Sequence, residues 1–139
     1  MDAVEEVRKW CKGDRKRMVD LEEEISTSIS PFLSEALTAL EEFLEGKESR
    51  EVVLSWCNDL FSYTLDAAEA IVDEYWKIPS TLVRWVSYVA NAYWLVHTEQ
   101  YEEALKELEK MADEVYPVWE WLRKELRLEG GEENVEGQN

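Results

Sequence analysis

The chain of 139 residues has little glycine, proline, cysteine or histidine, and each scarcity excludes a class of protein. Five glycines and three prolines are too few for a collagen-like chain, a flexible linker or a turn-rich β-sandwich. The two cysteines, Cys11 and Cys57, form no Cys-x-x-Cys motif, which excludes a zinc knuckle and a thioredoxin-like redox site. We expect both to be reduced thiols in the core of a cytoplasmic protein. With His97 as the single histidine, a Ser-His-Asp or Cys-His catalytic pair has one candidate base, and we expect no cofactor.

Long hydrophobic runs are also missing. The most apolar stretch, residues 81–96, contains Arg84 and Asn91 and is shorter than the roughly 20 apolar residues that a membrane span needs. The first ten residues are charged throughout and lack the apolar centre of a signal peptide. Glutamine and asparagine are scarce beside abundant glutamate, a composition typical of thermophiles. We therefore expect a cytoplasmic protein that makes no membrane contact.

Positive charge is scarce and confined. The 15 Lys and Arg face 32 Asp and Glu, a formal net charge of -17, which repels the phosphates of nucleic acids and membrane surfaces. Direct binding of nucleic acid is therefore not expected. Six of the 15 basic residues lie within ten positions and could contact a phosphate, dock on the acidic surface of a second copy, or simply be solvated. This basic cluster comprises Arg8, Lys9, Lys12, Arg15, Lys16 and Arg17.

Apolar residues recur at helical spacing along almost the whole chain, and no segment alternates with period two. The pattern predicts an all-α protein, a compact bundle of five to seven antiparallel helices. Residues 1–128 would form a single domain, and the apolar-poor residues 129–139 a disordered acidic tail. The predicted helices cover residues 2–12, 15–29, 31–45, 49–76, 81–97 and 98–128.

Three local features refine this prediction. Ser30-Pro31 is typical of a helix start, although the segments on either side could also form one kinked helix. Pro117 is expected to kink or split the last helix, since proline removes a backbone donor. The helix over 81–97 is apolar on nearly all sides, which predicts a central buried position.

One polar stripe runs along the predicted helix 81–97. Arg84, Asn91 and Trp94 recur on one face of it, and a buried arginine needs a carboxylate partner. The stripe therefore indicates either an internal ion pair with a hydrogen-bonded Asn91, or a pocket for an anionic or aromatic ligand. His97 at the end of the same helix is expected to be a partly exposed helix-end side chain, favoured there by the helix dipole.

The acidic residues contain one enzyme-like pattern. Glu41-Glu42-x-x-Glu45 places three carboxylates at neighbouring positions of a helix, where they could hold Mg²⁺. The pattern resembles the first half of the motif of MazG-like nucleoside triphosphate pyrophosphohydrolases. That family carries a Glu-x-x-Asp motif on the following helix, whereas here Asp66-x-x-Glu69 has the reverse order. The resemblance implies a metal set of Glu41, Glu42, Glu45 and Asp73.

Tryptophan, in contrast, is abundant, with seven residues in the chain. Trp119 and Trp121 lie about 200° apart on a helix, so both cannot point into one core. Exposed aromatic area marks surfaces that bind partners. The leading hypothesis is a non-enzymatic module that binds itself or a protein partner through Trp119, Trp121 and Trp94. The alternatives are the Mg²⁺-dependent nucleotide hydrolase and an acidic mimic of nucleic acid that inhibits a nucleic-acid-binding protein.

Overall fold

The computed structural model describes residues 2–128, and these residues form an all-α bundle, as the sequence predicts. The predicted disordered tail, 129–139, lies outside the described residues. No strand occurs within 2–128, and no helix in that range is long and apolar enough to cross a bilayer. The helices are α1 (Ala3–Cys11), α2 (Arg15–Glu24), the π-helical segment η1 (Ile25–Ile29), α3 (Ser30–Leu44), α4 (Arg50–Tyr75), α5 (Ser80–His97) and α6 (Tyr101–Glu125).

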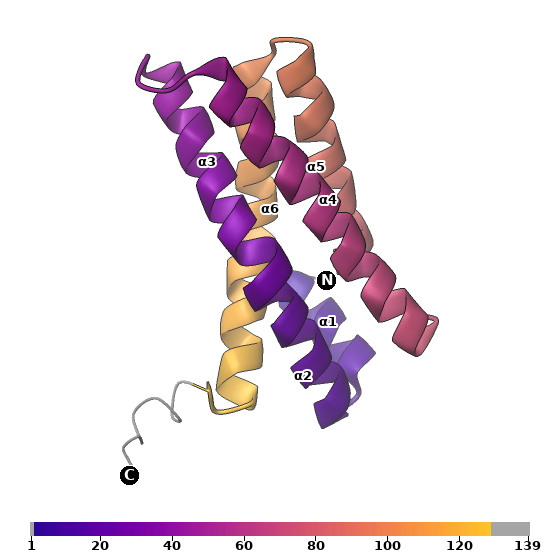
Figure 1. Cartoon of the computed structure of the whole chain (residues 1–139). Helices are drawn as coiled ribbons and strands as arrows, with labels where there is room; N and C mark the ends of the chain where they lie inside the picture. Colours follow the sequence, from indigo (N-terminus) through magenta and orange to yellow (C-terminus); the bar gives the residue numbers. More distant parts are fainter. Residues whose placement is uncertain (1, 129–139) are drawn as a thin grey trace.

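Two long antiparallel hairpins, α3–α4 and α5–α6, form the body of the bundle, and the short pair α1–α2 packs at one end (Figure 1). Helix α6 contacts α1, α2, α3, α5 and η1, so it is the central helix. The central position predicted for the helix over 81–97 is wrong. Helix α5 packs one side on α4 and another on α6, which leaves an outer face in solvent with Val83 54% and Trp94 63% exposed.

Side chains that precede three of the helices cap their first turns. The Asp2 carboxylate accepts a hydrogen bond from the Glu5 N–H at 2.8 Å, and the Asp14 carboxylate accepts one from the Lys16 N–H at 3.0 Å. Ser49 caps α4 in the same way through the Val52 N–H. Helix α5 begins at Ser80, one residue before the predicted start, and Pro79 precedes it with no side chain capping its first turn.

Of the two alternatives at Ser30-Pro31, a helix start or one continuous helix, the structure has the continuous helix. Helix α2 continues through η1 directly into α3, so residues 15–44 run without interruption. The wider π-helical turn takes up the Ser26-Thr27-Ser28 run, where both Ser26 and Thr27 hydroxyls donate to the Glu23 carbonyl. These side chains replace part of the lost backbone bonding, so a poor helical sequence stays helical.

Pro117 does not split the last helix either. Helix α6 runs unbroken from Tyr101 to Glu125 with Pro117 inside it. Pro117 and Asp113, one turn earlier, are both exposed, so solvent can hydrate the carbonyl that proline leaves without a donor.

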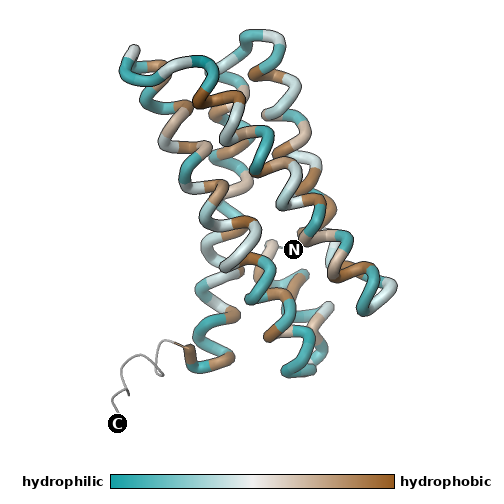
Figure 2. The backbone as a smooth tube through the Cα atoms, viewed as in Figure 1, coloured by the Kyte–Doolittle hydropathy of each residue, from teal (hydrophilic) through white to brown (hydrophobic). Residues whose placement is uncertain are grey.

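Apolar and polar residues are mixed along every helix of the bundle (Figure 2), and one continuous core fills its interior. Cys11 and Cys57 both lie in this core as free thiols, as expected from the absence of paired cysteine motifs. Burial raises the pKa of the Cys11 thiol to about 11 and that of the Cys57 thiol to about 12.

Candidate functional site

The most developed polar cluster joins α1, α5 and α6 around the side chain of Arg84. Its Nε donates to both oxygens of Glu114 at 3.1 and 3.0 Å, and its Nη2 donates to Glu6 Oε1 at 2.9 Å. Glu114 also accepts hydrogen bonds from the Trp85 indole N–H at 3.1 Å and the Tyr88 hydroxyl at 3.2 Å. The Thr81 hydroxyl donates to Glu6. Arg84 therefore has two carboxylate partners, Glu6 and Glu114, where the sequence predicted one.

These contacts make the Arg84 cluster a structural joint, meaning that its hydrogen bonds hold α1, α5 and α6 together. Hydrogen bonds from Arg84 and then Thr81 lower the pKa of Glu6, while those to Glu114 and Glu6 raise the pKa of the Arg84 guanidinium. A hollow of about 540 Å³ opens beside it, lined partly by Asp2, Asp113 and Glu114. With two carboxylates already on the guanidinium, an anionic ligand would face like charges there, so the geometry favours the internal ion pair over the anion pocket.

The other members of the polar stripe are separate from this joint. Asn91 donates to the Glu107 carboxylate at 3.2 Å on the exposed side of the α5–α6 contact. His97 is exposed at the last turn of α5, and its ring lies 4.5 Å from that of Tyr93. Trp94 packs edge-on against Tyr93 and is otherwise open to solvent. The stripe therefore provides an exposed aromatic group, and each of its polar members has its own contact, Arg84 with Glu6 and Glu114 and Asn91 with Glu107.

The basic cluster divides into fixed and free side chains. The Lys16 ammonium binds Asp20 at 3.0 Å and Glu74 at 2.8 Å, which raises its pKa. The Arg17 guanidinium donates to the Trp10 carbonyl at 2.6 Å, and Arg8 lies over the ring of Trp121. The remaining three are exposed and available for a partner: Lys9, Lys12 and Arg15.

The tryptophans are distributed differently from the sequence expectation. Trp119 and Trp121 are both half-buried against the core; Trp119 donates its indole N–H to Glu22 at 3.1 Å, and Trp121 lies beneath Arg8. The two opposite faces of α6 are thus covered by α2 and α1. The strongly exposed tryptophans are Trp94 and Trp76, the latter 91% exposed.

Sequence reasoning missed Trp76 as a binding candidate, although its position two residues before Ile78-Pro79 indicates a helix end. Trp76 ends α4 with φ 67° and ψ -38°, a backbone conformation that is unfavourable for a bulky residue. The turn is fixed from behind, because the Trp10 indole N–H donates to the Lys77 carbonyl at 2.8 Å. The Trp76 N–H donates to the Val72 carbonyl at 2.7 Å. The backbone at Trp76 is therefore fixed by two hydrogen bonds, and the indole extends from it into solvent.

The four carboxylates of the hydrolase hypothesis do not come together. Glu41, Glu42 and Glu45 lie at the end of α3 beside the start of α4, whereas Asp73 lies near the end of α4. At 1.5 Å per residue, about 35 Å of helix separates Asp73 from the α3–α4 turn. Within residues 2–128 no group of three Asp, Glu, His or Cys side chains is placed to hold a metal ion.

No family model matches the chain, and neither a curated protein nor a solved structure matches it. The residues themselves therefore carry the functional argument.

Proposed function

We propose that the protein is a non-enzymatic helical interaction module that contacts itself or a protein partner through its exposed tryptophans, Trp76 and Trp94. The observation that carries this proposal is the position of Trp76. A large apolar side chain is 91% exposed on a backbone conformation that costs energy, and the turn behind it is fixed by a hydrogen bond from a second tryptophan. The exposed indole and the costly backbone conformation bring no benefit to the isolated chain.

The energetics suit such a role. Burying one exposed tryptophan in an interface contributes at least roughly 1.5–3 kcal/mol, the size of a binding hot spot. The hydrogen bond to the Lys77 carbonyl fixes the backbone of the turn, so the ordering cost on binding falls on the Trp76 side chain and not on the turn. Trp94 offers a second contact on the outer face of α5, near the exposed Val83 side of that helix.

A cytoplasmic location belongs to the same proposal. It is supported by the two free, buried cysteines, since reduced thiols are typical of proteins in reducing compartments.

The proposal is tested by photo-crosslinking in extracts of the native cell. A benzophenone amino acid placed at position 76 or 94 should give discrete crosslinked protein species, identified by mass spectrometry. Position 19 is the matched control, because Val19 is exposed on α2 and carries no part of the proposed surface. If positions 76 and 94 give no more product than position 19, the proposal is wrong.

A further inference from the structure

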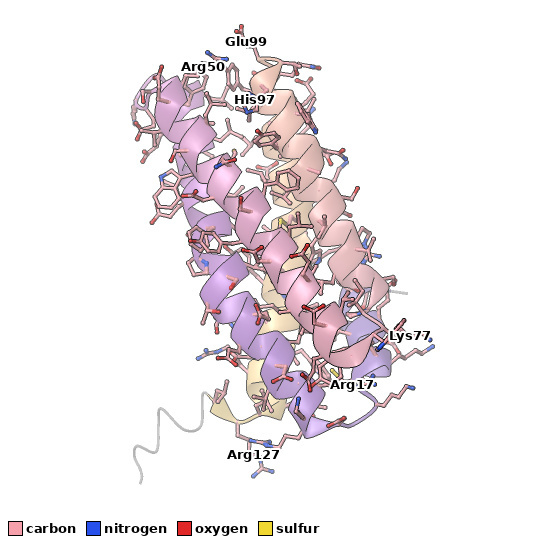
Figure 3. All side chains as sticks on the ribbon, turned by 45° about the vertical axis from the view of Figure 1, so that its right-hand side comes forward. Arg17, Arg50, Lys77, His97, Glu99 and Arg127 are labelled. Carbon is pink, nitrogen blue, oxygen red and sulfur yellow. The ribbon has the colours of Figure 1, made fainter. Side chains whose placement is uncertain are left out.

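The two ends of the bundle carry opposite charge. Ten of the 15 basic residues, with two acidic ones, belong to residues 8–17, Lys77 and residues 123–127. Figure 3 shows Arg17, Lys77 and Arg127 together at one end of the bundle, and Arg50, His97 and Glu99 at the other. We name the first the basic end.

The opposite end, named here the acidic end, consists of residues 41–51 and 99–103, which contain eight acidic and two basic residues. Helix α4 alone spans about 39 Å between them. Since this exceeds the screening length of about 8 Å at physiological salt, each end acts on a neighbouring molecule through its own charge.

The exposed Trp76 projects from the basic end. Lys77 follows it directly, and the acidic groups beside it are partly neutralised, since the Lys16 ammonium binds the Glu74 and Asp20 carboxylates. Asp73, three residues before Trp76, is also exposed. The anchor therefore lies beside groups of both signs, at an end where basic residues are in excess.

The acidic end contains a hollow that complements this anchor. It has a volume of about 320 Å³ and is lined by Leu44, Glu99, Gln100, Tyr101, Glu102 and Glu103. Leu44 is 40% exposed there and offers apolar surface. The Tyr101 ring is fixed, because it packs 4.5 Å from the Phe43 ring and its hydroxyl accepts a hydrogen bond from Arg50 Nε at 2.9 Å. The hollow is therefore a rigid apolar floor with a carboxylate rim.

We propose that Trp76 of one copy inserts into the Leu44–Tyr101 hollow of a second copy, so that molecules associate head to tail. The indole ring would cover the apolar floor and its N–H would donate to a rim carboxylate. The chain already uses this indole–carboxylate pairing at Trp85 with Glu114 and at Trp119 with Glu22. Lys77 and the free lysines of the basic cluster would face the acidic rim.

A second copy is the favoured occupant because one molecule carries both complementary surfaces. The contact joins different surfaces of the two copies, so it leaves one free anchor and one free hollow and can add further copies. The small ends and the net charge of -17 make it a weak, concentration-dependent contact. This inference rests on the proposed function and adds the identity of the partner.

The test is sedimentation velocity of the full chain from about 10 µM to about 1 mM, the range of weak contacts. Trp76→Ala disables the anchor, and the double variant Glu102→Lys, Glu103→Lys disables the hollow; both change exposed residues and should leave the circular dichroism spectrum unchanged. Trp94→Ala is the matched control, an exposed tryptophan that lines no part of the hollow.

We expect the wild type to form dimers and larger species, and each end variant alone to bind itself at least about thirty-fold more weakly, the effect of losing a hot spot. An equimolar mixture of the two end variants should form a one-to-one dimer and nothing larger, because each retains one working end. Raising salt from 0.15 to 0.5 M should weaken association.

Three results overturn the inference: a wild type that is monomeric throughout, association that survives Trp76→Ala, or a mixture of end variants that does not dimerise. Crosslinks from position 76 to a different protein, combined with a monomeric wild type, would refute head-to-tail association and leave the proposed function intact. Loss of association in Trp94→Ala but not in Trp76→Ala would likewise refute head-to-tail association through Trp76 and leave the proposed function intact.

Discussion

Trp76 combines an unfavourable backbone conformation with an exposed side chain. The backbone affects the stability of the fold, whereas the side chain affects binding. Strained backbone positions cost of order 1–3 kcal/mol, and at Trp76 the side chain returns little of this through packing, since it is 91% exposed. Two substitutions distinguish them: alanine removes the side chain and keeps the strained backbone, whereas glycine removes the side chain and relieves the strain.

We predict that Trp76→Gly is more stable than Trp76→Ala by about 0.5–1 kcal/mol. Glycine adopts the positive φ of this position without strain, whereas alanine retains the strain. Both variants lose the anchor and should associate equally weakly. Urea unfolding measures the difference in stability. A glycine variant less stable than the alanine variant would show that the turn is not strained.

The two cysteines provide a second prediction at the scale of single residues. Their pKa values, raised by burial to about 11 at Cys11 and about 12 at Cys57, leave almost no thiolate at neutral pH. Neither thiol should react with a thiol reagent at pH 7.5 in the folded protein, whereas both should react in 6 M guanidinium chloride. Rapid labelling of either one in the folded state would contradict the core position given to it here.

Among the elements, the junction of α1, α5 and α6 depends on Arg84. We predict that Arg84→Met destabilises the protein by about 2 kcal/mol, because it strands the Glu6 and Glu114 carboxylates. The figure is kept below that of a fully buried pair, since 33% of the Arg84 side chain is exposed. Lys124→Met, which breaks the exposed pair with Glu120, is the matched control and should cost no more than about 0.5 kcal/mol. Equal changes in melting temperature in the two variants would contradict the structural role given to Arg84.

The helices show where local sequence suffices and where it fails. Caps such as Asp2 and Ser49 act within one turn, so the starts of α1 and α4 could be predicted. The helix breaks considered at Pro31 and Pro117 do not occur, because a π-helical turn and solvent on an exposed face accommodate the two prolines. Such compensation depends on packing and exposure, which periodicity does not reveal.

The partners of the site residues were harder to predict. That Arg84 needs a carboxylate follows from its apolar neighbours, but Glu6 lies 78 residues away on a helix whose docking position the sequence does not encode locally. Likewise, Trp119 and Trp121 were expected to leave exposed surface, and instead α2 and α1 cover both sides of α6. Exposure of Trp76 arises from the corner between α4 and α5, a property of the turn.

At the scale of the whole molecule, paired carboxylates link stability to pH. The Arg84 and Thr81 hydrogen bonds lower the pKa of Glu6 from its ordinary value of 4.5, and the Tyr75 hydroxyl lowers that of Asp20. The folded state therefore binds these protons more weakly than the unfolded chain, so the stabilisation is complete above about pH 5 and is lost as pH falls through the lowered pKa values.

Glu6→Gln should accordingly be less stable than the wild type at pH 7, and the difference should shrink between about pH 4.5 and pH 3. Urea midpoints across this range measure it. A gap that stays constant with pH would mean that the Glu6 charge contributes nothing to the fold.

The central claim is that opposite ends of this bundle, one bearing Trp76 and the other the Leu44–Tyr101 hollow, bind each other. Small-angle X-ray scattering over a concentration series tests it most directly, because it reports the shape of the assembly as well as its mass. The account predicts that the maximum dimension grows by about 40 Å or more per added copy at constant cross-section, and that Trp76→Ala abolishes this growth. Scattering curves independent of concentration, or assemblies that thicken in cross-section instead of lengthening, would contradict it.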